Sequence, residues 1–451
     1  MNGTMEVAFG MAGGLALFLY GMNSMSDALQ KAAGERMKSI LSFLTKNPVM
    51  GALAGALVTA VLQSSSATTV MAIGFVSAGL MSLPQAISVI FGANVGTTMT
   101  AQLLAFQISD YIYPIIFIGF LMNFAGKSEK LKNVGLVIFS FGLLFEGIEI
   151  MGSVMKPLAG SPFFINLIGK VSQIPILGVL VGLFMTLIVQ SSSATIAVLQ
   201  NFASQAGPDG VSSVIGLAGA IPILLGDNIG TTITALLASI GQSKNAKRTA
   251  VAHSVFNITG SIVFLFMIPV LTAFVQMISP KGPEVAVISR QIANAHTTFN
   301  VVCTLVWLPL IAVMVKIVKL IIPGEDQNEN QAFQAKFLDE KVIGQPVAAM
   351  YLVSQELNRG AELAEGMLDL AKESLTGTNR KEARMEFAGS CSALERLQKN
   401  ISQYLTKMLS SGAMTEIQAE KTAGLLSVSN NLERITERCS DILQIVEKVQ
   451  N

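Results

Sequence analysis

The chain has 451 residues, of which 51% are hydrophobic and only 13% are charged, and its formal net charge is +1. A soluble globular domain carries about a quarter charged residues, so this composition excludes a fully soluble protein and predicts a surface that faces lipid. The near-neutral charge gives no reason to expect a nucleic-acid partner.

The charges are unevenly distributed along the chain. Residues 1–323 contain 16 Lys and Arg and 10 Asp and Glu, whereas residues 324–451 contain 14 and 19. The stretch PGEDQNENQ, which begins at Pro323, combines helix-breaking and acidic residues and is typical of a linker. We therefore predict a transmembrane domain at residues 1–323, a linker at 324–334 and a water-soluble domain at 335–451.

The membrane part of the sequence contains an internal duplication centred on the six residues QSSSAT. The stretch NPVMGALAGALVTAVLQSSSAT at residues 47–68 aligns with IPILGVLVGLFMTLIVQSSSAT at residues 174–195. The match continues from FGANVGTTMTA at residues 91–101 to LGDNIGTTITA at residues 225–235. Gly, Pro, Gln and Thr recur in one order, so chance similarity between apolar segments is improbable and a duplication is expected.

Basic residues near the ends of the predicted spans indicate that the two repeats have opposite orientations. The loop AFQISDY after the first GTT motif has no Lys or Arg, whereas residues 244–248 after the second have three. Because basic residues mark cytoplasmic loops, the corresponding loops are expected on opposite sides of the membrane. Repeats at about residues 8–125 and 134–265 would then form an inverted-topology fold, as in many secondary transporters.

The segments after the two QSSS motifs predict re-entrant helical hairpins. ATTVMAIGFVSAGLMS and ATIAVLQNFAS are too short to cross ~30 Å, which needs about 20 helical residues. Non-helical backbone is tolerated at membrane depth only where protein or a water-filled cavity satisfies it. We expect an all-α polytopic membrane protein with two re-entrant hairpins, two further spans at about residues 247–277 and 288–322, and a soluble C-terminal helical bundle.

The paired motifs have the chemistry of a site for an anion and its coupling cations. A helix that begins midway across the membrane directs unpaired N–H groups and its positive dipole end at the cavity. Hydroxyl and amide groups donate to an oxyanion, and their oxygens suit a hard cation such as Na⁺. The predicted anion ligands are Ser64, Ser65, Ser66, Ser191, Ser192, Ser193, Asn94 and Asn228. The predicted cation ligands are Gln63, Thr68, Thr97, Thr98, Gln190, Thr195, Asp227, Thr231 and Thr232.

Other roles are open to these residues. Ser and Thr commonly pack membrane helices together, but a duplicated run of four polar residues favours a site. Asp227 replaces Ala93 of the first repeat, and it is either a cation ligand or a carboxylate held by helix packing. Neither motif contains Arg or Lys, so a bound anion would need cations for neutralisation. The only histidines, His253 and His296, come with no G-x-S-x-G nucleophile motif, so an enzyme is not expected.

Paired QSSS motifs, each followed by G-x-N-[IV]-G-T-T, resemble those of the type II sodium–phosphate cotransporters and their bacterial relatives, over about residues 8–320. The resemblance implies sodium-driven phosphate uptake, with the QSSS serines around phosphate, nearby polar groups around Na⁺, and no cofactor besides the coupling ion.

Members of that family also carry an H-x-x-F-N motif, which occurs here twice, as His253 to Asn257 and as His296 to Asn300. The resemblance implies that these four polar residues support the ligands, although both histidines could instead pack helices while bonded to a neighbouring carbonyl. Some animal members have Asp directly after the histidine. Ser254 occupies that position in the first motif and Thr297 in the second, so an electroneutral cycle is expected.

In residues 335–451, apolar residues recur at intervals of three and four, which predicts three helices of a bundle. The segment NNLERITERCSDI resembles the L-E-R-I-G-D region of PhoU, a helical protein of phosphate signalling. That resemblance implies metal binding at Glu433 and Glu437, although an exposed acidic pair at this spacing is usually only solvated. We expect a cytoplasmic domain that dimerises or senses, so a homodimer and a regulatory partner are both open.

Three functions are compatible with the sequence. The first is a secondary active transporter in the cell membrane that couples inward Na⁺ movement to phosphate uptake by alternating access. The second is a membrane-anchored phosphate sensor that signals through the tail, and the third is a passive anion channel. The sequence leaves open the Na⁺ stoichiometry, the choice among phosphate, arsenate and other oxyanions, and the oligomeric state.

Overall fold

The architecture is all-helical and consists of two units, as given by a computed structural model of the chain. The structure describes residues 3–33, 47–106, 108–159, 170, 173–207, 209–324, 335–376, 380–412 and 414–450. Within these ranges it contains α-helices and short 3-10 helices but no β-strand. The predicted all-α fold class is therefore confirmed.

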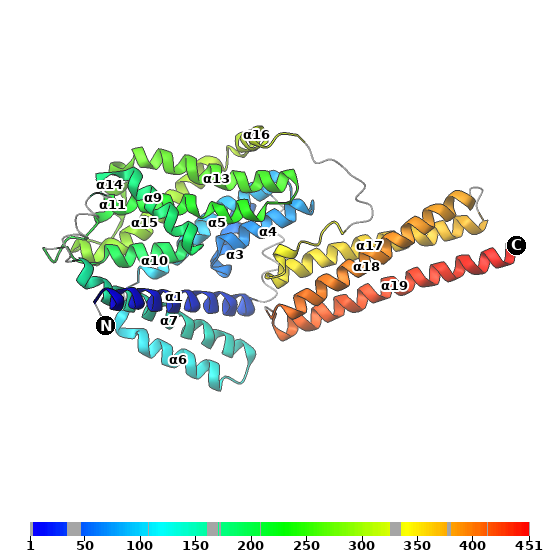
Figure 1. The fold of residues 1–451 in the computed structure, drawn as a ribbon, viewed down its shortest axis with the longest axis horizontal. Helices are drawn as coiled ribbons and strands as arrows, with labels where there is room; N and C mark the ends of the chain where they lie inside the picture. The colour runs from blue at the N-terminus through cyan, green and yellow to red at the C-terminus, as the bar shows by residue number, and fades with distance from the viewer. Residues whose placement is uncertain are drawn as a thin grey trace. The chain divides into compact units, whose positions relative to one another are not determined.

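The first unit comprises Met1–Ile73 and Ser82–Pro323 (Figure 1). Its helices are α1 (Gly3–Ala33), α3 (Pro48–Leu62), α4 (Ser65–Ser77, of which the residues after Ile73 are assigned to the second unit), α5 (Leu83–Leu104), η1 (Ser109–Tyr111), α6 (Ile112–Ala125), α7 (Glu129–Ala159), α9 (Pro175–Val189), α10 (Ser192–Ala203), α11 (Gly216–Gly230), α12 (Thr232–Ala238), α13 (Lys244–Phe266), α14 (Ile268–Ile278), α15 (Glu284–Trp307) and α16 (Ile311–Ile321). Five described segments are long and apolar enough to cross a membrane, and α15 with α16, bent by 89°, would make a sixth.

The two repeats have matching half-length helices on either side of each QSSS motif. In the first repeat α3 has 15 residues and α4 has 13, and in the second α9 has 15 and α10 has 12. At 1.5 Å per residue each helix reaches roughly 18–23 Å, which is short of a hydrocarbon core of ~30 Å. These lengths are what re-entrant hairpins require, while the hairpins themselves and the inverted orientation of the repeats stay predictions.

Glycines hold the helix before each QSSS motif against the helix that carries the GTT motif. A Cβ on Gly55 of α3 would collide with the Val89 carbonyl, and one on Gly182 of α9 would collide with the Ile223 carbonyl. Between membrane helices there is no hydrophobic driving force, so small residues that allow close backbone approach provide the packing. The glycines that align between the repeats are therefore points of helix contact.

One buried apolar cluster joins helices of both repeats with α13 and α15. It includes Phe91 of α5, Ile196 of α10 and Leu225 of α11. The phenylalanines of the two H-x-x-F-N motifs, Phe256 and Phe299, are fully buried in it, and Phe256 stacks on Phe91 with ring centroids 4.8 Å apart. The H-x-x-F-N helices are thus part of the core that positions the duplicated motifs.

The second unit consists of Gly324–Asn451 together with Gly74–Met81. Its long helices, α17 (Pro346–Thr376), α18 (Arg380–Ser410) and α19 (Glu416–Gln450), run side by side in Figure 1. Apolar residues from α17 and α18, such as Leu352 and Leu405, are fully buried among them. The prediction of three helices after residue 335 is confirmed. Residues 325–334 of the predicted linker lie outside the described residues.

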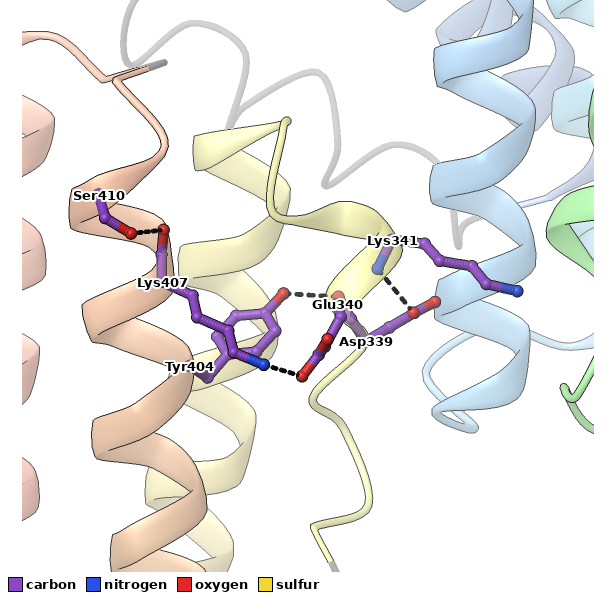
Figure 2. A network of polar contacts seen from close by, with 6 residues as sticks. All are labelled: Asp339, Glu340, Lys341, Tyr404, Lys407 and Ser410. Carbon is purple, nitrogen blue, oxygen red and sulfur yellow. Dashed lines mark hydrogen bonds and ion pairs between the residues drawn. The ribbon is translucent and has the colours of Figure 1, made fainter.

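Polar contacts fix the short 3-10 helix η3 (Glu340–Val342), which precedes α17, to α18 (Figure 2). The Tyr404 hydroxyl donates to the Asp339 backbone carbonyl at 2.8 Å, and Lys407 forms an ion pair with Glu340. Burial raises the pKa of the Tyr404 hydroxyl, so this side chain stays a neutral donor at physiological pH. The start of the helical bundle is therefore anchored by a hydrogen bond that pH changes near neutrality leave intact.

Replacing Gly55 by Ala should destabilise the first unit by about 1–3 kcal/mol, because the added methyl group collides with a backbone carbonyl that has no freedom to rotate away. The measurement is thermal unfolding of the full-length protein in detergent. Gly13→Ala is the matched control, since a Cβ at Gly13 of α1 meets no atom within 4 Å. Equal melting temperatures for the two variants would contradict the role of Gly55.

Candidate functional site

Each QSSS motif is a break between two helices, formed by a Gln in the left-handed backbone conformation. Gln63 has φ 51° and ψ 25°, and Gln190 has φ 57° and ψ 23°. Among the described residues, these are the only positions other than glycine with positive φ. The conformation costs a non-glycine residue roughly 1–2 kcal/mol, and such strain concentrates at functional sites. The predicted interruption of the helix at both motifs is confirmed.

The first serine of each motif caps the helix that follows. The Ser64 hydroxyl oxygen accepts from the Ala67 N–H at 3.1 Å, and the Ser191 hydroxyl oxygen accepts from the Ala194 N–H at 3.2 Å. The cap engages only the third N–H of α4 and of α10. The first two N–H groups, on the second and third serines, lie at the positive end of the helix dipole. This arrangement can bind an oxyanion through N–H groups and hydroxyls together.

Threonines of the GTT helices contact the first QSSS motif from both repeats. The Thr100 hydroxyl on α5 donates to Gln63 Oε1 at 2.8 Å, and Ser66 Oγ lies 3.0 Å from Thr234 Oγ1 of the second repeat. The QSSS motif of the first repeat is therefore in direct contact with the region after the GTT motif of the second repeat. Thr100 and Thr234 are not among the site residues predicted from sequence, although their aligned positions after the two GTT motifs were a signal that could have identified them.

The two glutamines differ in exposure although their backbones are alike. Gln63 is buried, and its amide nitrogen donates to the Ala60 carbonyl at 2.6 Å while its carbonyl accepts from Thr100. Gln190 is exposed. The first break is therefore closed by side chains, whereas the second break is open at the equivalent position.

Each H-x-x-F-N motif contacts the Asn of one GTT-region motif. His253 Nε2 lies 3.1 Å from Asn94 Oδ1, and His296 Nε2 lies 3.3 Å from Asn228 Oδ1. Both Asn amide nitrogens donate to a backbone carbonyl one turn earlier, so each Oδ1 is an acceptor and each imidazole must donate from Nε2. Each histidine thus contacts a side-chain carbonyl, and that carbonyl belongs to an asparagine of the predicted anion site.

The asparagines of the two H-x-x-F-N motifs contact the same side chains as the histidines. Asn257 and Asn300, one turn after the histidines, donate to the same two Oδ1 atoms at 3.5 Å. The Oδ1 atoms of Asn94 and Asn228 are therefore occupied, and each side chain keeps one amide hydrogen with which to reach an anion. The Nδ1 atoms of both histidines are buried acceptors with no partner in the described part of the chain.

The four threonines of the GTT motifs bond to their own helices. Thr97 and Thr231 donate to the carbonyls four residues earlier, at 3.1 and 2.9 Å, and Thr98 and Thr232 donate to the carbonyls three residues earlier, both at 2.8 Å. These bonds use the hydroxyl hydrogens, so what the threonines retain for a ligand is oxygen lone pairs. That leaves them suited to a cation rather than to an oxyanion.

Asp227 is fully buried and lies in a cluster of hydroxyl groups. The Thr186 hydroxyl donates to Asp227 Oδ1 at 2.6 Å, and Thr186 Oγ1 lies 3.1 Å from Thr195 Oγ1 on α10. The predicted cation ligands Asp227 and Thr195 are therefore brought together by Thr186, which is not among the ligands predicted from sequence. Its alignment with Thr59 of the first repeat was the available signal.

The acidic pair in the tail has the surroundings of a solvated surface. Glu433 Oε2 accepts from Gln398 Nε2 at 3.0 Å, and both Glu433 and Glu437 are exposed. In the part of the chain that the structure describes, no group of three or more His, Cys, Asp or Glu side chains is placed to hold a metal ion. Metal binding at this pair stays a prediction without structural support.

Family models match both units of the chain. The model described as Na⁺/Pi-cotransporter matches residues 17–153 and again residues 147–288, and the model of the PhoU domain matches residues 357–446. The chain belongs to the Na⁺/Pi-cotransporter family. Two matches to one model confirm the duplication, and phosphate transport across a membrane is the activity of this family.

Similar proteins come from bacteria and mammals. The uncharacterized protein YqeW of Bacillus subtilis is 34% identical over 266 residues, which are 59% of this chain and 84% of YqeW. The putative inorganic phosphate export protein YjbB of Escherichia coli K12 is 25% identical over 427 residues, 94% of this chain and 75% of YjbB. Sodium-dependent phosphate transport protein 2A of Rattus norvegicus is 38% identical over 97 residues, 21% of this chain and 15% of that protein. No solved structure matches the chain significantly.

The unequal exposure of the two glutamines can be tested with a matched pair of cysteine variants, Gln63→Cys and Gln190→Cys. Both are made in a background whose native cysteines, at positions 303, 391 and 439, are changed to serine. A water-soluble maleimide should label Gln190→Cys at least tenfold faster, because a buried thiol is shielded and ionises less readily. Equal labelling rates in detergent would contradict the structural difference between the two breaks.

Proposed function

We propose that this protein is a secondary active transporter that couples Na⁺ movement to the transport of inorganic phosphate. The observation that carries the proposal is the pair of left-handed breaks, each of which presents a serine-capped helix N-terminus at a duplicated polar motif. Phosphate oxygens would bind the N–H groups and hydroxyls of Ser64–Ser66 and Ser191–Ser193, with an amide hydrogen from Asn94 and from Asn228.

The need for a cation follows from the charge of phosphate. Neither duplicated motif contains Lys or Arg, so helix dipoles and hydroxyls alone would face a dianion in a region of low dielectric. Burying such a charge without a counter-ion is costly. The oxygen atoms of Gln63, Gln190, Thr68 and the GTT threonines suit Na⁺, and its binding beside phosphate would lower that cost.

The direction of transport would follow from the two gradients, because a symporter moves both solutes the same way and each step is reversible. An inward Na⁺ gradient then drives phosphate uptake, which is the direction we propose. Export is the second candidate, because a relative that matches 94% of this chain is named a putative inorganic phosphate export protein. The same symport cycle runs outward when the outward phosphate gradient exceeds the inward gradient of Na⁺.

The PhoU-like tail would give the transporter a cytoplasmic domain through which phosphate supply regulates it. The family match at residues 357–446 supports a link to phosphate physiology, and the acidic excess of residues 324–451 suits an aqueous compartment. A homodimer through this domain and a separate regulatory partner are both consistent with a bundle of three helices.

The test is uptake of radiolabelled phosphate into proteoliposomes that contain the full-length protein. An inward Na⁺ gradient should drive uptake that an equal K⁺ gradient does not. Ser65→Ala and Ser192→Ala should each weaken the apparent phosphate affinity about 10- to 100-fold, because a hydrogen bond to a charged group contributes about 1.5–3 kcal/mol. Ser153→Ala, which changes an exposed serine of α7, is the control.

The outcomes separate the three candidate functions. Uptake that is equally fast with and without Na⁺ identifies a passive anion pathway, and phosphate binding without uptake identifies a sensor. Loading phosphate inside the vesicles and reversing both gradients measures export. Unchanged phosphate affinity in both serine variants, with folding intact, would overturn the assignment of the anion site.

A further inference from the structure

The two repeats use the same pair of threonines to connect the two helices of each QSSS break. In the first repeat, the Thr59 hydroxyl donates to Thr68 Oγ1 at 2.8 Å, and Thr68 donates to the Ser64 carbonyl at 3.2 Å. The position on the GTT helix that aligns with Asp227 is Ala93, whose side chain has no polar atom. Each of the two threonine hydroxyl hydrogens therefore has an acceptor, and the hydrogen bonds of this cluster are satisfied without a ligand.

The equivalent cluster of the second repeat has too few hydrogens for its acceptors. Thr186 Oγ1 has one hydrogen but lies within hydrogen-bond distance of Asp227 Oδ1 at 2.6 Å, the Gly182 carbonyl at 3.0 Å and Thr195 Oγ1 at 3.1 Å. Asp227 Oδ2 is buried and has no hydrogen-bond partner within the described ranges. Within the described residues, this cluster therefore has more acceptor oxygens than hydrogen-bond donors.

A negative charge on Asp227 would also lack compensation from the protein. Asp227 is completely buried, and in the described part of the chain no Lys, Arg or His side chain forms an ion pair with it. An ionised carboxylate in the interior of a membrane protein is expensive unless it is paired, and such residues commonly mark ion pathways. A bound cation would supply the missing positive charge and would satisfy Oδ2.

We propose that Asp227, Thr186 and Thr195 form a binding site for a hard monovalent cation, and that this carboxylate-containing site exists only in the second repeat. The inference deepens the proposed function and rests on it for the identity of the ion as Na⁺. Thr186 Oγ1 lies within hydrogen-bond distance of Asp227 Oδ1 and of Thr195 Oγ1, so the site offers carboxylate and hydroxyl oxygens, the ligand type that hard cations prefer.

The same cluster connects the cation site to the anion site. Thr195 donates through its hydroxyl to the Ser191 carbonyl at 3.2 Å, and Ser191 caps the N-terminus of α10. A cation bound by Asp227 and Thr195 would therefore fix the helix end whose N–H groups face the proposed phosphate. Binding of the cation would prepare the anion site through two hydrogen bonds and without a long-range rearrangement.

The experiment measures thermal unfolding of full-length protein in detergent, in NaCl and in choline chloride without phosphate, together with Na⁺ activation of phosphate uptake in proteoliposomes. Wild-type protein should melt at a higher temperature in NaCl, because an ion that binds only the folded state stabilises it. Asp227→Ala, which copies Ala93, should reduce this shift by at least half, because the oxygens proposed as Na⁺ ligands elsewhere remain, and should weaken Na⁺ activation at least tenfold. Thr186→Val should weaken both responses several-fold.

Ser153→Ala, which changes an exposed serine of α7, is the control; its Na⁺-dependent shift should equal that of wild type. Asp227→Asn keeps the shape of the side chain and serves if Asp227→Ala does not fold. An unchanged Na⁺ shift and unchanged Na⁺ activation in the Asp227 variants would overturn the site while leaving sodium-coupled transport standing. A Na⁺ shift that depends on Asp227, in a wild-type protein whose phosphate uptake ignores Na⁺, would support the site and refute the proposed coupling.

Discussion

The structure depends on two places where a helix is interrupted within the apolar part of the chain and starts again at a serine. Hydrocarbon offers no hydrogen bonds, so each unpaired backbone group there costs several kcal/mol and must be met by protein, water or a ligand. The left-handed Gln63 and Gln190 make the break, and Ser64 and Ser191 satisfy part of it. The N–H groups that the serine caps do not engage are the physical reason for a ligand at this position.

The packing around the breaks also helps to satisfy the polar groups that the breaks leave in an apolar region. Backbone contacts at Gly55 and Gly182 bring the helix before each break against the GTT helix. The histidines then hold the Asn side chains of the GTT helices from α13 and α15, in a polar network that is buried on all sides. Hydrogen bonds are stronger in such a low-dielectric setting, and an unmet partner costs more. Within the described residues, the atoms of this network that have no hydrogen-bond partner include Nδ1 of both histidines.

Much of this could be predicted from the sequence, because the relevant signals are local or periodic. The helix breaks, the duplicated glycines and the three helices of the tail follow from residue type and spacing alone. The contacts of Ser66 with Thr234 and of His253 with Asn94 could not be predicted in that way, since they join segments 168 and 159 residues apart. The difference between buried Gln63 and exposed Gln190 is also beyond local sequence, because identical motifs cannot specify different states.

The difference between the two repeats bears on the relative free energies of the states that a duplicated transporter could adopt. If two halves of a fold were identical, the state with the first half closed and the state with the second half closed would have equal free energies. Every substitution between the repeats unbalances the two states, and Asp227 in place of Ala93 adds an ionisable carboxyl group at a buried position. A ligand shifts such an equilibrium only through its different affinity for the two states. A cation that neutralises Asp227 acts on one half alone, so it can favour one state over the other in a way that a symmetric pair of sites could not.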